Sequence, residues 1–333
     1  MNKSSILKIL INTVIGVVLI LIWLQFVDIN QIIGAILKAN FVLLLPAFLF
    51  MFLSLFVRSV RLKIFLAPVK KVSLKDLTLL NGVGIMLNFL IPIRAGEVAK
   101  GLYLNTQYGL PLGKSIIWIF LDRFIDFMMV LVMASVLLFV VPTKLNETFT
   151  LTLTVIALGV IMITYLMIYQ VDFTKKLIKF LKPLLIINII KIYFDRFTNF
   201  FLDTFSILKR SPLDITKFAF LSFLSYIADA LIWYFTFLSL GYPQQFPKMF
   251  LGQVLSALTY LVPAAPGYVG SAEASGSLIL SGVFDVPVNI ASAMVVLFHM
   301  ASAIYIILFG IISLYGIKID LSLIFNKALK REK

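Results

Sequence analysis

Six long apolar segments, joined by shorter polar connections, are the strongest pattern in this sequence. An α-helix needs about 20 residues to cross the hydrocarbon layer of a bilayer, and these segments are close to or longer than this length. The pattern therefore predicts an all-α polytopic integral membrane protein with six full spans. We place the spans at about 8–27, 41–57, 115–141, 149–169, 218–240 and 288–316.

Two further apolar stretches, at about 78–113 and 249–284, are interrupted by proline, glycine and charged residues. The interruptions run from Asn88 to Lys100 in the first stretch and from Pro263 to Glu273 in the second. Proline removes a helical hydrogen bond, and glycine is a poor helix former. Each stretch is therefore expected to be a re-entrant hairpin or a pair of broken helices, and the pattern alone leaves both alternatives open.

Positive charge predicts the orientation of the spans. Segment 58–76 is rich in Lys and Arg and includes Arg58 and Arg61, and segment 170–217 holds nine basic residues against four acidic ones. The positive-inside rule places both segments and both chain termini in the cytoplasm, as expected for a multi-pass protein of the cell membrane. Six spans alternate correctly only if each broken stretch returns to the side from which it entered.

We expect one transmembrane domain over residues 1–333, built as two halves. The first half covers about 41–169 and the second about 218–316, with a basic cytoplasmic connection over about 170–217 and a basic tail over 317–333. In the connection, apolar residues recur at near-helical spacing among lysines. This spacing indicates an amphipathic helix on the inner leaflet, with a solvated basic loop as the alternative. The apolar positions are Leu177, Phe180, Leu181, Leu184 and Leu185.

Composition narrows the possible functions. Hydrophobic residues make up 61% of the 333 positions and charged residues 13%, against roughly half and about a quarter in soluble domains. The net charge of +14 indicates anionic lipid headgroups rather than nucleic acid as partners, because the basic residues lie between apolar spans. Without cysteine and with only His299, no metal centre or other cofactor is expected. No phosphate-binding loop or nucleophile elbow is present, which weakens an enzymatic function without excluding it.

The two interruptions resemble each other. When Asn88–Gly96 is aligned with Thr259–Gly267, a Leu, a β-branched residue, a Pro and a Gly coincide, and a glutamate follows each segment. A full span with a basic or titratable residue comes next, carrying Arg123 in one case and His299 in the other. This arrangement predicts an inverted-topology repeat whose broken helices meet near the midplane. The alternative is that Pro and Gly only kink two ordinary helices.

Several charges fall deep inside predicted spans. Asp122, Arg123 and Asp126 lie roughly 10 to 17 Å from the start of their span, and Asp229 and His299 lie at comparable depth. An unpaired charge at the bilayer centre costs about 2.5–3.5 kcal/mol on insertion scales. The trio on one helical face is therefore either a structural ion pair or a functional group, and a lone histidine is more often hydrogen-bonded packing.

The interruptions themselves carry the most specific chemistry. Arg94 and Glu97 flank Gly96, where an open backbone could form an anion nest and arginine could grip a phosphate with two hydrogen bonds. In the second interruption, Pro266, Gly267 and Gly270 precede Glu273, which could hold a cationic group, accept a hydroxyl or carry a proton. A simple helix cap is the alternative for Glu273.

Three motifs resemble the flippase-like family that is named for the transmembrane region of bacterial lysylphosphatidylglycerol synthase, the multiple peptide resistance factor. They are Asn88-x3-Pro92-x-Arg94-Ala-Gly96-Glu97, Asp122-Arg123-x2-Asp126 and Pro263-x2-Pro266-Gly267-x2-Gly270-x2-Glu273. The resemblance implies an inverted-repeat fold that moves a lipid, in the best-known members an aminoacylated phospholipid, between leaflets, and it suggests a homodimer. Two departures matter: an arginine is expected where His299 stands, and no soluble aminoacyl transfer domain follows, so lysyl transfer is not expected.

The expected function is translocation of an anionic or aminoacylated phospholipid through a polar midplane cavity. One alternative is the membrane subunit of a split transferase of the phosphatidylglycerol lysyltransferase type with a separate soluble enzyme, and another is a non-transporting lipid-binding scaffold. The candidate residues comprise a headgroup site (Asn88, Arg94, Gly96, Glu97, Arg123, Gly267, Gly270, Glu273), helix breaks (Pro92, Pro263, Pro266) and coupling or ion-pair positions (Asp122, Asp126, Asp229, His299).

Overall fold

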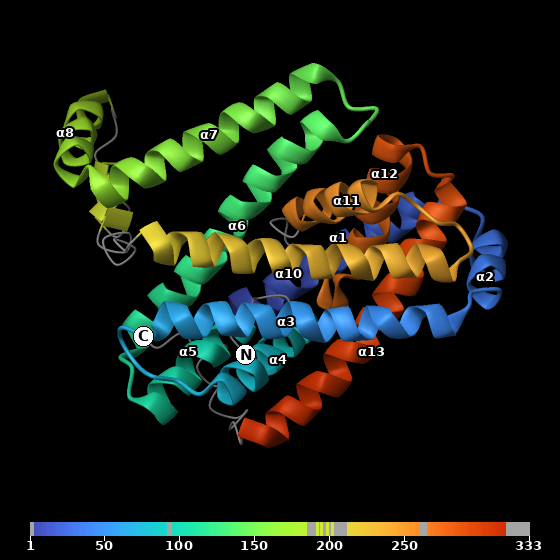
Figure 1. The fold of residues 1–333 in the computed structure, drawn as a ribbon, viewed down its shortest axis with the longest axis horizontal. Helices are drawn as coiled ribbons and strands as arrows, with labels where there is room; N and C mark the ends of the chain where they lie inside the picture. The colour runs from blue at the N-terminus through green and yellow to red at the C-terminus, as the bar shows by residue number, and fades with distance from the viewer. Residues whose placement is uncertain are drawn as a thin grey trace.

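The chain folds into a bundle of α-helices (Figure 1). The computed structural model describes residues 3–91, 95–184, 212–259 and 265–317, with a few short helical pieces between 191 and 202. The described residues are 87% helical and contain no strand. The predicted all-α membrane fold is confirmed.

Five helical segments of the described chain are long and apolar enough to span a membrane, and they match five of the six predicted spans. The first predicted span corresponds to α1 (Lys3–Leu24), which continues after a bend of 90° into α2 (Ile29–Leu37) and passes the same test only as this bent pair. The five segments are η1 with α3 (Phe41–Leu44 and Leu45–Leu66), α6 (Leu112–Val140), α7 (Glu147–Tyr169), α10 (Pro212–Ser239) and α13 (Val288–Ile317).

The span predicted to end at about residue 57 is longer than expected, while the cytoplasmic side of segment 58–76 stays a prediction. Helix α3 continues to Leu66, so Arg58 and Arg61 lie within a spanning helix rather than after it. Both arginines pair with aspartates of other helices, Arg58 with Asp229 and Arg61 with Asp122. These partners are distant in the sequence. For this reason Arg58 and Arg61, followed by further basic residues, resembled the cytoplasmic end of a span.

The two interrupted stretches are pairs of helices. Helices α4 (Leu74–Leu90) and α5 (Ala95–Tyr108) pack against each other, as do α11 (Phe246–Thr259) and α12 (Ser271–Phe284). A short 3₁₀ turn, η3 (Pro266–Tyr268), precedes α12. Both pairs are interrupted at the predicted proline and glycine segments, while Pro92, Arg94 and Pro263 themselves lie outside the described residues.

The four helices α3–α6 are followed, after α7 and α8, by a second set of four helices, α10–α13. Helices α5 and α12 both have 14 residues and begin 176 positions apart, at Ala95 and Ser271. Helices α6 and α13 have 29 and 30 residues and also begin 176 positions apart, at Leu112 and Val288. Two similar halves would produce this correspondence, and the division into halves stays a prediction. The relation of the halves by inversion stays a prediction.

Helix α1 packs against the second predicted half of the chain. Gly16 lies against the turn that precedes α12, where a Cβ atom would collide with Ala265 and with the Val269 carbonyl. The Trp23 indole N–H donates to Ser277 Oγ at 3.2 Å and to Ser292 Oγ at 3.1 Å. Helix α1 therefore touches the second broken pair directly.

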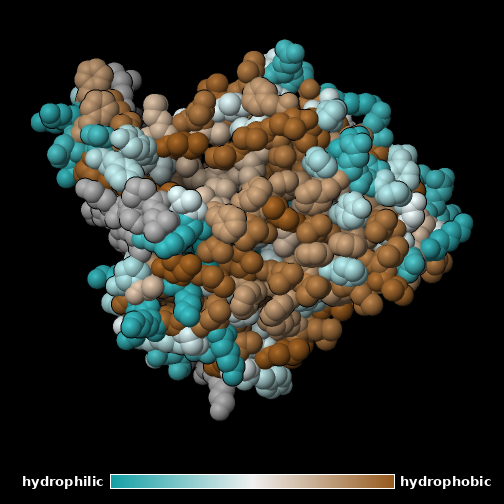
Figure 2. Space-filling view, viewed as in Figure 1, coloured by the Kyte–Doolittle hydropathy of each residue, from teal (hydrophilic) through white to brown (hydrophobic). Residues whose placement is uncertain are grey.

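The outer surface is apolar over most of the face in Figure 2, with polar residues gathered toward two opposite ends. Side chains such as Val155, Leu158 and Ile312 are exposed, although they belong to spanning helices. In water this surface would be strongly unfavourable, and in a bilayer it contacts lipid chains. The chain is a multi-pass membrane protein.

The connection after α7 begins as helix α8 (Val171–Leu181). Its lysines, Lys175, Lys176 and Lys179, alternate with apolar side chains, and Phe173 and Phe180 are exposed. An amphipathic helix, rather than a solvated loop, therefore starts the connection. Its attachment to the inner leaflet stays a prediction.

Helices α4 and α13 pack closely through glycine, which provides a test of the fold. A Cβ atom on Gly82 would meet Phe309 and Ser313, so Gly82→Leu is expected to overpack this contact and destabilise the protein by about 1–3 kcal/mol. The matched control is Gly159→Leu on α7, where a Cβ atom meets nothing within 4 Å. Thermal unfolding in detergent should show a lower midpoint for Gly82→Leu alone. Equal midpoints for the two variants would contradict the α4–α13 packing.

Candidate functional site

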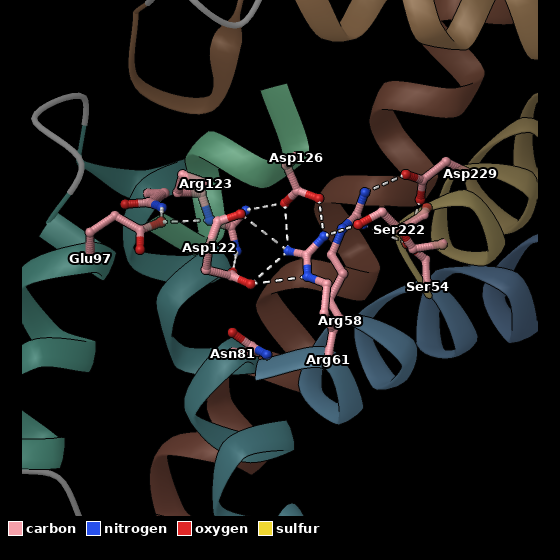
Figure 3. A network of polar contacts seen from close by, with 12 residues as sticks. Ser54, Arg58, Arg61, Asn81, Glu97, Asp122, Arg123, Asp126, Ser222 and Asp229 are labelled. Carbon is pink, nitrogen blue, oxygen red and sulfur yellow. Dashed lines mark hydrogen bonds and ion pairs between the residues drawn. The ribbon is translucent and has the colours of Figure 1, made fainter. Parts of the chain in front are cut away.

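A buried arginine joins three spanning helices. The Arg61 side chain on α3 is 1% exposed and lies between Asp122 and Asp126, which are one turn apart on α6 (Figure 3). Its Nε donates to Asp122 Oδ1 at 3.0 Å and its Nη2 to Asp126 Oδ2 at 2.9 Å, while Nη1 bonds Asp126 Oδ1 and donates to Ser222 Oγ of α10 at 2.6 Å. This one guanidinium engages both carboxylates.

A second ion pair lies beside the first and ties α3 to α10. Arg58 Nη2 donates to Asp229 Oδ2 at 2.6 Å, and the Ser54 hydroxyl donates to Asp229 Oδ1 at 2.5 Å. The Arg58 guanidinium also lies over the Tyr226 ring, 5.3 Å from its centroid. Asp229, predicted as a deep charge, is thus held in a structural pair between two spans.

Arg123 on α6 is held much more loosely. Its side chain is 37% exposed, and the one hydrogen bond it donates within the described part of the chain runs to Asp122 Oδ2 at 3.3 Å. Its ion-pair distances are 3.5 Å to Asp126 and 3.9 Å to Glu97. Because Arg61 takes the shorter bonds of both aspartates, Arg123 keeps N–H donors for another acceptor.

The first turn of α5 brings predicted residues together next to Arg123. Asn88 Oδ1 accepts a hydrogen bond from the Gly96 N–H at 2.8 Å, and Asn88 Nδ2 donates to Glu97 Oε1 at 3.2 Å. A Cβ atom on Gly96 would collide with the Gly84 carbonyl of α4, so only glycine allows this approach. Asn88, Gly96, Glu97 and Arg123 therefore form one polar site.

Lys100 also belongs to this site, although it was not among the predicted residues. Its side chain is 4% exposed, and its Nζ lies 3.7 Å from Glu97 Oε2. The i, i+3 spacing from Glu97 on a helix is the signal that could have identified it. Together with the pairs above, the described network holds four cations and four carboxylates and is neutral (Arg58, Arg61, Lys100 and Arg123 against Glu97, Asp122, Asp126 and Asp229).

A second polar site forms where α12 begins. One oxygen of Glu273, Oε2, accepts a hydrogen bond from the Gly270 N–H at 2.7 Å, so the glutamate does cap the helix. The other oxygen, Oε1, contacts His299 Nδ1, and His299 Nε2 lies 2.7 Å from the Gly267 carbonyl oxygen. His299 is therefore bound on both sides to the second broken element.

Glycine is required at two positions of this turn. Gly267 and Gly270 have φ angles of +69° and +83°, in the region where side chains other than glycine are strained. A Cβ atom on Gly270 would also collide with the Gly16 carbonyl of α1. Pro266 starts the 3₁₀ turn. The motif thus builds a tight backbone turn that offers a carbonyl to His299.

The C-terminal end of α4 lies between the two sites. Asn88 contacts the first site, while its neighbour Phe89 lies edge-on to the His299 ring at 6.1 Å between centroids and 6.3 Å from Tyr268. The two sites also share a spacing, because Glu97 and Arg123 are 26 positions apart, as are Glu273 and His299. Each half thus pairs the glutamate of its short helix with a residue of its following span.

Comparison with known protein families shows to which family the chain belongs. The family described as lysylphosphatidylglycerol synthase TM region matches residues 6–310, nearly the whole chain. The chain belongs to this family. No curated protein and no solved structure matches it.

Membership of the lysylphosphatidylglycerol synthase transmembrane-region family confirms the resemblance drawn from the motifs. It identifies the chain as a membrane domain related to that of the synthase. The roles assigned to individual residues stay predictions. In this member, the position where the resemblance led us to expect arginine holds His299, and that histidine contacts Glu273.

The buried pair predicts a large difference between two neighbouring arginines. Arg61→Ala leaves Asp122 and Asp126 without their main partner, and removing one member of a buried pair costs about 3–5 kcal/mol. Arg123→Ala removes a partly exposed, longer contact and should cost much less. Thermal unfolding in detergent should therefore show a large fall for Arg61→Ala only. A fall of the same size in both variants would contradict the assignment of Arg61 as the structural partner.

Proposed function

We propose that this protein moves a phospholipid with an anionic or aminoacylated headgroup between the two leaflets. The observation that carries this proposal is the partly exposed, loosely paired guanidinium of Arg123 inside a spanning helix. Charged groups within a membrane segment are costly, and they are usually retained where they bind a substrate or ion. Most other charges of the described network are held at short distances, so Arg123 is the group best suited to exchange partners.

The headgroup would bind at the contact between Arg123 and Glu97. A phosphate accepts two parallel hydrogen bonds from arginine, whereas Glu97 now lies 3.9 Å from Arg123 Nε. Entry of the phosphate would shift Arg123 away from Glu97, which could then hold an amine or hydroxyl of the same headgroup. Asn88 orients Glu97 in this scheme. Arg94 is proposed as a second phosphate ligand on the evidence of its sequence motif.

Movement between leaflets would use the two halves as an inverted repeat. In support, helices α5 and α6 correspond in length to α12 and α13, and α3 and α10 lie side by side and run in opposite directions in Figure 1. Small shifts of the broken pairs α4–α5 and α11–α12 would expose the headgroup to each side in turn. The proposal places the protein in the cell membrane, as a homodimer with cytoplasmic termini.

The proposal predicts that Arg123→Ala loses bound lipid. A hydrogen bond to a charged group contributes about 1.5–3 kcal/mol, so the content of one co-purified anionic or aminoacylated lipid should fall by roughly tenfold or more. Lys144→Ala is the matched control, because Lys144 forms an exposed pair with Asp285 that takes no part in the network. Lipids that co-purify in mild detergent are identified by mass spectrometry.

A leaflet assay then separates the functions. In proteoliposomes containing a fluorescent analogue of the enriched lipid, wild type and Lys144→Ala should move it between leaflets, and Arg123→Ala should not. Stable lipid binding without movement would favour a scaffold. Formation of a modified lipid only when a soluble enzyme and an activated donor are added would favour the split transferase. The same unselected bulk lipid in all three proteins would remove the support for a headgroup site at Arg123.

A further inference from the structure

Both ring nitrogens of His299 face oxygen atoms that accept hydrogen bonds. Nε2 lies 2.7 Å from the Gly267 carbonyl oxygen, which can only accept, so Nε2 must carry a proton. Nδ1 contacts Oε1 of Glu273. A neutral imidazole with its proton on Nε2 would direct the Nδ1 lone pair at an ionised carboxylate, and the two would repel. The contact is therefore stable only when a second proton lies between Nδ1 and Oε1.

We infer that Glu273 and His299 together form a proton-binding site that, when occupied, fastens the Gly267 turn to α13. With the proton present, His299 bridges the carboxylate and the carbonyl. When the proton leaves to solvent, Nδ1 and Oε1 repel, and the ring must turn away from at least one of its two acceptors. Glu273 stays anchored through Oε2 to the Gly270 N–H, so the histidine contacts are the ones that open.

Among the residues that the structure describes, Glu273 is the charged side chain in contact with His299. Of the described elements packed against α13 here, α4 faces the ring with Phe89, η3 with the Gly267 carbonyl and α12 with Glu273. On α3 and α10, Arg58 and Asp229 are paired with each other at 2.6 Å.

Of the other charges on the packed elements, Arg61 of α3 is paired with Asp122 and Asp126. The rest lie at or near helix ends, including Lys63 on α3 and the pair of Asp214 and Lys217 on α10. On α2 these are the flanking residues Asp28 and Lys38, and on α4 they are Lys75 and Asp76 in its first turn. Asp285 follows α12 and pairs with Lys144. None of these side chains has a contact with His299 among those that the structure describes, so Glu273 is the charged group that sets its protonation.

The corresponding pair of the first half cannot behave in this way. Glu97 is paired with Arg123, and arginine stays protonated at all physiological pH values. Glu273 is paired with the only histidine of the chain. One half therefore carries a permanent cation and the other a cation that can be lost. This inference rests on the proposed function in one respect, because it makes proton binding the means by which movement of the second broken pair would be coupled to a gradient.

Because His299 is the only histidine of the chain, the protonation of its ring can be measured directly. The full chain is labelled with ¹⁵N-histidine and placed in lipid nanodiscs, where nuclear magnetic resonance reports both ring nitrogens of His299. At pH 7, wild type should show both nitrogens protonated, and Glu273→Gln should show a neutral ring. The amide oxygen that this substitution introduces can still accept the hydrogen bond from the Gly270 N–H, so the helix cap survives. A neutral ring in wild type, or an unchanged ring in Glu273→Gln, would overturn the inference.

Hydrogen–deuterium exchange at one fixed pH tests the link to the turn. His299→Arg keeps a permanent cation and should preserve the protection of residues 266–274, whereas His299→Leu loses both contacts and should increase exchange there. Equal exchange in both variants would contradict a fastening role. Neither measurement needs transport. A charged histidine without lipid movement would therefore count against the proposed function alone, and a neutral histidine with active movement would count against this inference alone.

Discussion

The bundle depends on one buried guanidinium. Arg61 carries its charge into an interior that excludes water, where it is tolerable only because two carboxylates and a hydroxyl receive its N–H groups. These partners come from α6 and α10, so the charge sets how three spans align. The same pairing leaves Arg123, next in sequence to Asp122, with only long contacts. Because the two aspartates are bound by Arg61, Arg123 keeps N–H groups that can donate to another acceptor.

The two halves use similar frames for different chemistry. In each, a glutamate near the start of a short helix meets a residue 26 positions later on the following span. The first half embeds its glutamate in a network of charged side chains that includes Lys100 and Arg123, whereas the second gives its glutamate one imidazole and one backbone N–H as partners. Asn88 and Phe89, adjacent on α4, contact one site each. A displacement of the C-terminal end of α4 would therefore change contacts at both sites.

Much of this architecture could be predicted, because hydropathy and helix breaking are local properties. The spans, the two interruptions and the polar residues Asn88, Glu97 and Glu273 all follow from patterns within about twenty residues. Arg58 and Arg61 could not be placed in the same way. Close together and before further basic residues, they resemble a cytoplasmic loop, and only aspartates 61 or more positions away reveal that they are inside a helix. The partners of His299 could not be predicted for the same reason, since they lie on η3 and α12.

The contact of α1 with the second broken pair has a consequence for biosynthesis. Trp23 and its acceptor Ser277 are separated by 254 residues, and Gly16 meets the turn before α12 at a similar separation. At a translation rate of about 5–20 residues per second, roughly 10–50 s pass between the appearance of α1 and that of its partner. Through that interval α1 lacks these contacts, and lipid or an insertion factor must cover the face that later packs against α12.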